Sequence, residues 1–306
     1  MIEVADLTKA FGRVMAVDGL SFKVGEGEIV GFLGPNGAGK TTTMRLLTGF
    51  LSADRGKVEI DGINVEEGKR ELQRMIGYLP ENNPLYQEML VQELLEFCSK
   101  LTGMGKDDYR RGLEFVVGAM DIGDVYYRPI KELSKGYKQR VGMAAALIHD
   151  PKVVIMDEPT EGLDPNQRSE IRGLIKNLSK KRTIILSTHV MGEAQALASR
   201  LVIISRGKLV ADGKLGELGQ RKSKRIEVEI EGNKVVEAMG KSKTMKIVRT
   251  NKMAGKNRWK LELTAGKGQQ VQPEISKLAA KNKWIIWKLV EEEKNLEEVF
   301  GELTRE

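Results

Sequence analysis

A glycine-rich stretch, Gly34-Pro-Asn-Gly-Ala-Gly-Lys-Thr-Thr42, constrains the fold of this chain more than any other feature. An apolar run over residues 28–33 precedes it, and apolar residues at helical spacing follow it (Met44, Leu46 and Leu47). This order predicts a strand, a loop and a helix. Two glycines separated by four residues and followed by Lys and Thr form the pattern of a phosphate-binding loop. A glycine-rich turn that binds nothing is the weaker interpretation, because the flanking elements and the Lys-Thr pair agree.

Each part of this loop has a physical role. The glycines allow successive backbone N–H groups to turn inward at a helix N-terminus, which makes a concave cradle for phosphate oxygens. Lys40 is expected to reach the β- and γ-phosphates, and the Thr41 hydroxyl is expected to bind Mg²⁺. The residues expected at the nucleotide are Gly34, Pro35, Asn36, Gly37, Ala38, Gly39, Lys40, Thr41 and Thr42. The sequence therefore predicts a nucleoside triphosphate as ligand.

A second apolar run, residues 153–156, ends in the acids Asp157 and Glu158. Strands often end in acids, so this pattern alone is weak. In the same sheet as a phosphate-binding loop it is strong, because Asp157 can then hold Mg²⁺ through a water beside Thr41. Glu158 would be placed to polarise the attacking water as general base. The two motifs together predict hydrolysis of the bound nucleotide.

The composition narrows the classes of protein. At 306 residues the chain suits one large domain or two ordinary ones. No apolar run approaches the ~18 residues that span a bilayer, and no signal peptide opens the sequence. The single cysteine, Cys98, excludes an internal disulfide and a cysteine-built zinc site, and it favours a reduced, cytoplasmic setting. Its apolar neighbours predict a buried, inert thiol.

The net charge of +7 is unevenly distributed. Residues 221–306 contain 20 Lys and Arg against 13 Asp and Glu, whereas the preceding part contains 30 of each. A basic surface can bind nucleic acid or an anionic membrane, but scattered lysines more often form a solvated face.

The sequence predicts an α/β core followed by a smaller unit. Residues 2–7, 20–24, 57–61 and 75–79 predict short strands, residues 82–133 show helical periods, and residues 152–156 and 183–187 predict buried parallel strands. A hairpin over 201–205 and 208–212 is expected to close the first domain, and residues 213–224 are expected to form a linker. This alternation indicates an α/β core with an inserted helical segment.

The last part of the chain predicts a ferredoxin-like order, β-α-β-β-α-β. The expected strands are 225–230, 244–250, 257–264 and 283–290, and the expected helices are 233–239, 271–281 and a final 295–303. Trp259, Trp284 and Trp287 alternate with lysines, which superficially suggests stacking on nucleic-acid bases. In the strands of a small domain, packing in the core or at a sheet edge is the favoured interpretation.

Further motifs, in a fixed order, resemble those of the ATP-binding subunits of ABC transporters over roughly residues 1–215. Leu133-Ser-Lys-Gly-Tyr-Lys-Gln-Arg140 resembles the signature, whose usual core is LSGGQ, and Gly162-Leu-Asp164 resembles the D-loop. His189 resembles the family's switch histidine, and Phe11 occupies the position of the aromatic residue that stacks on adenine. The resemblance implies a P-loop NTPase core (1–220) with an antiparallel β subdomain and a helical subdomain at about 82–135, then a small α+β accessory domain (221–306).

The resemblance also implies roles for individual residues. Glu158, His189 and Lys40 would be catalytic, Thr41, Asp157 and Glu81 would bind Mg²⁺, and Phe11, Ser134 and Gly136 would add to the loop in binding ATP. Ser134 would cap a helix whose N-terminal N–H groups meet a γ-phosphate. That phosphate lies in a partner chain, so the resemblance implies a head-to-tail dimer, either homo- or heteromeric.

The chain departs from the family pattern at three positions. Lys135 replaces the first glycine of the LSGGQ core and Tyr137 replaces its glutamine, while Ser134 and Gly136 are retained. Glu81 stands where the family usually has a glutamine. Its carboxylate can still approach Mg²⁺.

The function implied is the ATP-hydrolysing motor of an exporter, peripheral on the cytoplasmic face of the membrane and coupled to a separate permease. The tail, residues 295–304, resembles that of ATPases serving drug, lipid, polysaccharide and gliding-motility exporters, and its stripe of Leu296, Val299, Phe300 and Leu303 predicts a docking face. The rival hypothesis is a soluble ABC ATPase acting on nucleic acid or ribosomes. The single cassette disfavours it, so no nucleic-acid partner is expected. A non-hydrolysing regulatory module is disfavoured by Glu158.

Overall fold

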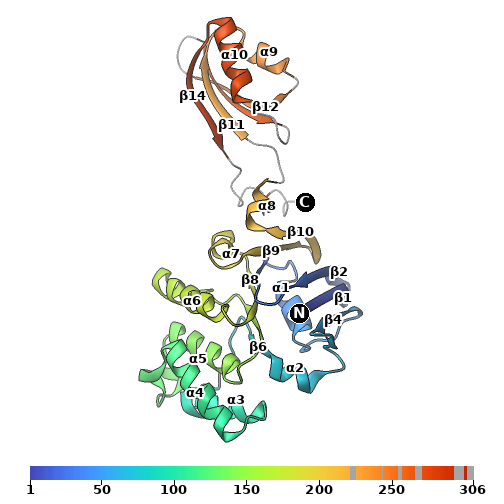
Figure 1. The fold of residues 1–306 in the computed structure, drawn as a ribbon, viewed down its shortest axis with the longest axis vertical. Helices are drawn as coiled ribbons and strands as arrows, with labels where there is room; N and C mark the ends of the chain where they lie inside the picture. The colour runs from blue at the N-terminus through green and yellow to red at the C-terminus, as the bar shows by residue number, and fades with distance from the viewer. Residues whose placement is uncertain (221–224, 243, 254–256, 266–270, 293–299, 302–306) are drawn as a thin grey trace. The chain divides into compact units, whose positions relative to one another are not determined.

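The computed structural model describes residues 1–220, 225–242, 244–253, 257–265, 271–292 and 300–301. Its internal contacts divide the chain into two compact units that meet between Leu215 and Gly216. Figure 1 shows the fold of each unit.

The N-terminal unit is built on a six-stranded sheet with the order β10-β9-β3-β8-β7-β6. All neighbouring strands are parallel except β10, which pairs with β9 in the antiparallel direction. Every residue of β7 and β8 is buried, as expected for parallel strands covered on both faces. The strands are β3 (Ile29–Leu33), β6 (Ile76–Leu79), β7 (Val153–Asp157), β8 (Thr183–Thr188), β9 (Arg200–Ser205) and β10 (Lys208–Lys214).

An antiparallel sheet with the order β2-β1-β4-β5 packs against the same core. Its strands are β1 (Ile2–Phe11), β2 (Val14–Val24), β4 (Arg55–Ile60) and β5 (Ile63–Asn64). The helix α1 (Lys40–Leu47) contributes Met44 and Leu47 to this core, which it shares with side chains from both sheets. The ring centroids of Phe22 and Phe32, one residue from each sheet, lie 5.7 Å apart. The phosphate-binding loop is therefore anchored between two sheets.

Helices α3 (Val91–Leu101), α4 (Lys106–Met120) and α5 (Lys135–Leu147) lie together on the side away from the antiparallel strands (Figure 1). They share a second core with α6 (Pro165–Leu178) and with residues of β7 and β8. The helices α2 (Lys69–Met75) and α7 (Met191–Leu197), and short 3₁₀ turns at Gly123–Val125 and Ile130–Glu132, complete this unit. The predicted P-loop NTPase core with an antiparallel subdomain and an inserted helical segment is confirmed.

The C-terminal unit has the predicted ferredoxin-like topology, with all strands antiparallel in the order β12-β13-β11-β14. Both of its helices contribute to one core, with Val235 and Met239 from one helix and Ile275 from the other, so they cover one face of the sheet (Figure 1). The elements are β11 (Arg225–Glu231), α9 (Val235–Gly240), β12 (Met245–Lys252), β13 (Arg258–Ala265), α10 (Gln272–Asn282) and β14 (Ile285–Glu292).

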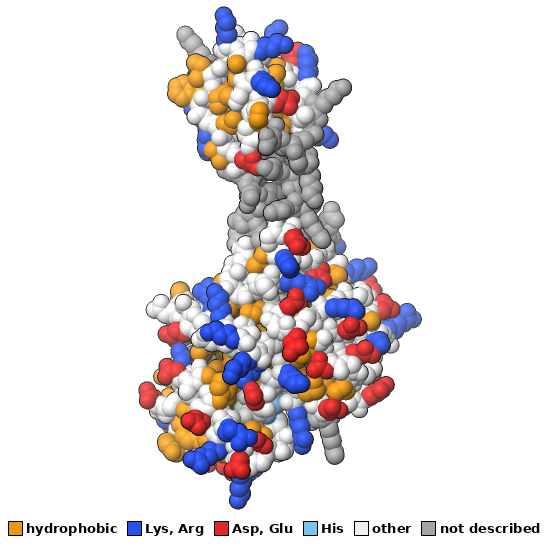
Figure 2. Space-filling model, in the orientation of Figure 1, with side chains coloured by type: hydrophobic (Ala, Val, Ile, Leu, Met, Phe, Trp, Pro, Cys, Tyr) orange, Lys and Arg blue, Asp and Glu red, His pale blue; other side chains and the backbone are white. Residues whose placement is uncertain are grey.

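The other face of this sheet carries charged side chains that form ion pairs. Glu227 pairs with Lys260 at 2.8 Å and with Lys288 at 2.6 Å, and the hydrogen bonds from these two lysines hold its pKa below the usual value. The visible face of this unit carries more basic than acidic side chains, whereas the two are interspersed over the N-terminal unit (Figure 2). Part of the positive excess is thus neutralised within the unit itself.

The three tryptophans pack in different ways. Trp284 is 8% exposed, and its ring N–H donates to the carbonyl of Asn233 at 3.1 Å. Trp259 is half-buried against the core. Trp287 lies on the edge strand β14, 55% exposed, with the Arg258 guanidinium 4.4 Å from its ring. Core and edge packing therefore account for all three.

The predicted linker over residues 213–224 is wrong for most of its length. Strand β10 continues through Lys214, and α8 (Leu215–Gln220) follows directly. Leu218 is buried, so this helix has an apolar anchor that the Gly- and charge-rich composition concealed. Residues 221–224 lie outside the described residues.

Most of the predicted final helix, with Leu296, Val299 and Leu303, lies outside the described residues, although Phe300 and Gly301 are helical. Among the described helices, none has both the length and the apolar character needed to cross a bilayer.

We expect a fragment of residues 1–220 to fold and to bind ATP, because every predicted nucleotide-binding residue lies before residue 190 and the two units have separate cores. ATP at about 100 times its Kd should stabilise the fragment by ~2.7 kcal/mol, visible as a higher Tm in a thermal melt. The same fragment carrying Lys40→Ala is the control and should shift much less. Insolubility of the fragment, or a Tm that ATP leaves unchanged, would contradict this domain assignment.

Candidate functional site

The phosphate-binding loop joins the end of β3 at Leu33 to the start of α1 at Lys40. Gly39 has φ of +101°, and a Cβ at this position would collide with the carbonyl oxygen of Ala16. Only glycine fits both the backbone conformation and the space. The Thr43 backbone N–H and hydroxyl both donate to the Gly39 carbonyl at 2.9 Å, which fixes the first turn of the helix. The loop therefore presents a helix N-terminus at the carboxyl edge of the sheet, as the sequence predicted.

The Lys40 side chain folds back over the loop. Its ammonium donates to the carbonyls of Gly34 at 2.9 Å and Pro35 at 3.3 Å. It also lies 3.3 Å from Oε1 of Glu158, and both side chains are only 6% exposed. A buried ammonium and a buried carboxylate thus neutralise each other at the mouth of the phosphate cradle.

Glu158 is held by several contacts. Nδ1 of His189 lies 3.1 Å from the same carboxylate oxygen that faces Lys40. The Glu158 backbone N–H donates to the Ser187 hydroxyl at 3.0 Å, and this hydroxyl donates to Oδ1 of Asp157 at 2.5 Å. Glu158 also has φ of +48°, a conformation that non-glycine residues adopt mainly where the surroundings impose it. The structure thus brings together the three residues predicted to be catalytic.

Asp157 and Thr41 lie where a cation site was predicted. Asp157 is fully buried, and its Oδ2 has no hydrogen-bond partner within the described part of the chain. The Thr41 hydroxyl donates to Oε2 of Glu81 at 3.4 Å. Burial and the nearby Asp157 carboxylate raise the pKa of Tyr78 to about 12, so its hydroxyl stays neutral. The unsatisfied oxygen of Asp157 and the paired Thr41 hydroxyl and Glu81 carboxylate are oxygen donors of the kind that Mg²⁺ prefers.

Lys40, Thr41, Glu81 and Glu158 line a cavity of about 360 Å³. It is lined by Val14, Met15, Ala16, Asn36, Gly37, Gly39, Lys40, Thr41, Thr42, Glu81, Glu158 and Glu161. Phe11, predicted to stack on adenine, is 52% exposed and is not part of the lining. It ends β1, directly before the turn that leads to Val14, so the described lining on this side comes from the first residues of β2.

The first helical turn of the predicted signature segment is capped by Ser134, as expected. The Ser134 hydroxyl accepts from the Tyr137 backbone N–H at 3.3 Å. A Cβ at Gly136 would lie 2.9 Å from Cδ of Gln167, so glycine gives that side chain room. The amide of Gln139 donates to the Pro159 carbonyl at 2.9 Å, which ties α5 to the segment after Glu158. Ser134 and Gly136 do not line the cavity of their own chain.

Sequence reasoning missed a buried network beside the site. One oxygen of the Glu193 carboxylate accepts from Thr160 at 2.7 Å and from Thr188 at 3.2 Å. These contacts tie the segment after Glu158 to the segment that carries His189. Ser187 was also missed as a structural residue. Its place at the end of a buried strand beside β7 was the only signal in the sequence.

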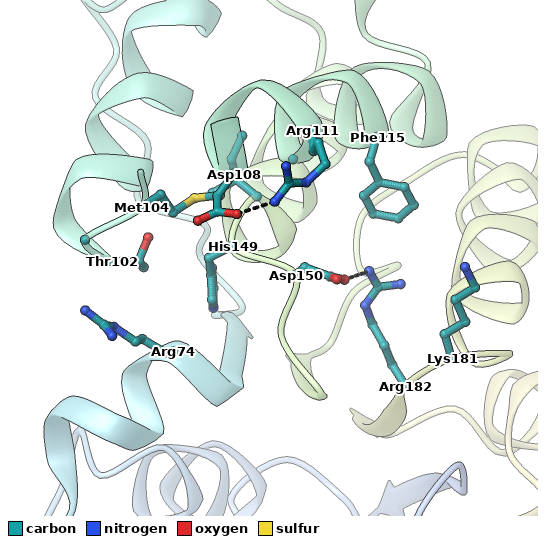
Figure 3. A pocket seen from close by; sticks show the side chains of 13 residues that line it. Arg74, Thr102, Met104, Asp108, Arg111, Phe115, His149, Asp150, Lys181 and Arg182 are labelled. Atoms are coloured by element: carbon teal, nitrogen blue, oxygen red, sulfur yellow. Dashed lines mark hydrogen bonds and ion pairs between the residues drawn. The ribbon is translucent and has the colours of Figure 1, made fainter. Parts of the chain in front are cut away.

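A second cavity, of about 490 Å³, lies at the opposite ends of the strands, near the starts of β6 and β8 (Figure 3). It is lined by Arg74, Thr102, Gly103, Met104, Asp108, Arg111, Gly112, Phe115, Ile148, His149, Asp150, Lys181 and Arg182. Arg182 is buried, pairs with Asp150 at 2.5 Å and lies 4.9 Å from the Phe115 ring. Its Nε and the Nδ1 of His149 have no hydrogen-bond partner in the described residues. Burial lowers the pKa of His149, so this imidazole is neutral near pH 7.

Comparison with known proteins places these features in one family. Residues 17–161 match the family described as ABC transporter. The uncharacterised ABC transporter ATP-binding protein MJ1023 of Methanocaldococcus jannaschii is 40% identical over 218 residues, which cover 71% of this chain and 79% of that protein. The bacitracin transport ATP-binding protein BcrA of Bacillus licheniformis is 38% identical over 242 residues, 78% of each chain. The Nod factor export ATP-binding protein I of Rhizobium etli is 37% identical over 218 residues, 71% of this chain and 69% of that protein.

Solved structures agree with these relatives. An ATP-binding subunit of an ABC transporter, 30% identical, superposes with a TM-score of 0.65 over 71% of this chain and 91% of that one. The dimeric structure of MJ0796, described as a bacterial ABC transporter cassette, is 25% identical and superposes with a TM-score of 0.64 over 70% of this chain and 99% of that one.

Replacing Glu158 by glutamine is expected to preserve ATP binding and to slow hydrolysis by ~10²–10⁴-fold, because the amide keeps the shape of the side chain but cannot accept a proton. Phosphate release under saturating ATP measures the rate, and calorimetry measures the affinity. Glu161→Gln, a nearby carboxylate of the same cavity, is the matched control and should hydrolyse ATP much faster than the Glu158 variant. A Glu158→Gln protein that turns over at the wild-type rate would show that another group is the base.

Lys40→Ala is expected to weaken nucleotide binding itself, since it removes a point charge from the phosphates. A loss of about 1.5–3 kcal/mol of binding free energy corresponds to ~10–100-fold in Kd. The affinity is measured by titration with ATP in the presence of Mg²⁺. Arg45→Ala, on the same helix, is the control and should retain binding. An unchanged Kd for Lys40→Ala would count against this loop as the phosphate site.

Proposed function

Because the chain belongs to the ABC transporter family, as an ATP-hydrolysing subunit, we propose that it powers an exporter through a separate membrane permease, as one half of a dimer that ATP closes. The observation that carries the proposal is the cluster of Lys40, Glu158 and His189 at the phosphate-binding loop, with Lys40 and Glu158 buried and in contact.

The cluster supports a defined hydrolytic step. The phosphates of ATP give the Lys40 ammonium a new anionic partner, which releases the Glu158 carboxylate from its ion pair. Glu158 then accepts a proton from the water that attacks the γ-phosphorus, and the bond to the bridging oxygen of ADP breaks. His189 holds the carboxylate from its other side.

The cation site supports this step. Asp157, Thr41 and Glu81 would hold Mg²⁺, which neutralises charge on the phosphate oxygens when it is bound. The Ser187 hydroxyl fixes one oxygen of Asp157, and this leaves Oδ2 of that residue for the cation or for a water bound to it.

A second ATP-binding subunit is the first partner that we propose. Ser134 is exposed at the start of a capped helix outside the cavity of its own chain, which leaves its side chain available to the nucleotide of another subunit, whereas Gly136 is buried. A similar protein, MJ0796, has been described as a dimer. The second subunit can be this chain or a related one.

The second partner is an integral-membrane permease, with this chain bound peripherally on the cytoplasmic face. The names of BcrA and of the Nod factor protein, which refer to transport and export, support an export function. We propose that the cavity in Figure 3 receives a segment of the permease, since its lining combines the apolar side chains of Met104 and Phe115 with charged side chains and with unsatisfied polar atoms on Arg182 and His149.

This function is tested by co-expression with a multi-span membrane protein encoded beside this chain. The wild type should co-purify with it in detergent and hydrolyse ATP faster when the pair is reconstituted with cargo. Arg111→Glu, on the cavity rim, should reduce recovery of the pair by about tenfold or more, as expected when a like charge replaces a complementary one. ATP hydrolysis by the isolated subunit should not change.

Arg110→Glu is the matched control, because Arg110 is exposed on the same helix but does not line the cavity. Equal recovery of both variants would reject the docking assignment. Failure of the wild type to bind the membrane protein at all, together with binding to nucleic acid, would favour the soluble alternative.

A further inference from the structure

The carboxylate of Glu193 is buried between the segments that follow β7 and β8. This residue lies in the first turn of α7 and is only 9% exposed. Its Oε2 accepts from the hydroxyl of Thr160 at 2.7 Å and from that of Thr188 at 3.2 Å, and both threonines are buried. The Arg168 guanidinium lies 4.0 Å from the other oxygen, Oε1. A buried carboxylate is costly unless hydrogen bonds compensate, and an apolar side chain often fills such a space at least as well. Packing alone therefore does not explain this acid.

The two threonines flank residues that we assign to the hydrolytic site. Thr188 directly precedes His189, and its hydroxyl oxygen also accepts from the Val190 backbone N–H at 3.1 Å, so the chain is fixed on both sides of the histidine. Thr160 follows Glu158 by two residues. A single carboxylate oxygen thus joins the two segments whose side chains meet where Nδ1 of the histidine lies 3.1 Å from Oε1 of Glu158.

We propose that Glu193 is a positioning residue for ATP hydrolysis, which holds His189 at contact distance from Glu158 through the two threonine hydroxyls. The inference rests on the proposed function, because it takes Glu158 as the base and His189 as the side chain that holds it. Glu193 does not line the cavity at the phosphate-binding loop, so its effect reaches the reaction only through these neighbours. A misplacement of about 1 Å in the reacting groups can cost ~10²-fold in rate.

The full chain carrying Glu193→Leu tests this role, since leucine fills the space but accepts no hydrogen bond. The rate of hydrolysis is measured with Mg²⁺ and ATP, at a subunit concentration above which the rate per subunit no longer rises. We expect kcat to fall by ~10–100-fold, while KM and the Kd for ATP stay within a few-fold of the wild type. Glu193→Gln keeps an acceptor oxygen and should recover most of the rate. Gln195→Leu, at an exposed position of the same helix, is the matched control and should behave as the wild type.

A double variant, Glu193→Leu with Thr160→Val, separates positioning from stability. It removes both partners of the shorter hydrogen bond, and such paired replacement by apolar groups can be nearly neutral for stability. Its Tm should therefore lie above that of Glu193→Leu, whereas its kcat should stay as low. The double variant carries the same kinetic prediction if the single variant does not fold.

Four results would overturn the inference. These are a wild-type kcat for Glu193→Leu, an affinity for ATP that falls as much as kcat, a glutamine variant as slow as the leucine variant, and a kcat that recovers with Tm in the double variant. The last result would mean that the network only stabilises the fold. If Glu158→Gln itself hydrolyses ATP at the wild-type rate, the proposed function fails first, whatever the Glu193 variants do.

Discussion

The buried ion pair between Lys40 and Glu158 is the interaction on which the rest of the site depends. It joins the phosphate-binding loop to the end of β7, two segments that are more than 100 residues apart in the sequence. Removing one partner of such a pair costs about 3–5 kcal/mol, because the other charge stays buried without compensation. A γ-phosphate can replace Glu158 as the partner of Lys40. We propose that the ion pair with Lys40 keeps the Glu158 carboxylate from acting as a base until the γ-phosphate takes its place.

The surrounding fold keeps this pair in position. Strands β3, β7 and β8 are neighbours in one parallel sheet, so their carboxyl ends place Lys40, Glu158 and His189 along the same edge. Ser187 and Glu193 add hydrogen bonds that link the ends of β7 and β8. At the opposite end of the sheet, the charged cavity is lined by Asp150, shortly before β7, and by Arg182, directly before β8. A permease bound there would therefore contact segments that lead into the strands whose other ends carry the side chains that we propose to be catalytic.

Local patterns predicted much of this arrangement. The strand, loop and helix around Gly34–Thr42, the cap at Ser134 and the ferredoxin-like order each depend on residues close together in sequence, and their elements appear within a few residues of the expected bounds. The Ser187 bridge and the Glu193 network could not be predicted in this way, since they join segments that only the sheet brings together. The linker prediction failed because Leu218 finds a buried site that the composition does not reveal. Phe11 pairs with Val14, which lines the cavity, but does not line it itself. Its position is set by the turn after β1, which the sequence pattern did not predict.

The central claim is that one chain carries half of a hydrolytic site and that a second subunit completes it. The most direct test is the rate of ATP hydrolysis per subunit, measured at saturating Mg²⁺ and ATP over a wide range of subunit concentrations. If the claim is correct, the rate per subunit is close to zero at high dilution, rises in proportion to concentration and then reaches a plateau. A rate per subunit that stays constant down to concentrations at which sedimentation finds only monomers would contradict it.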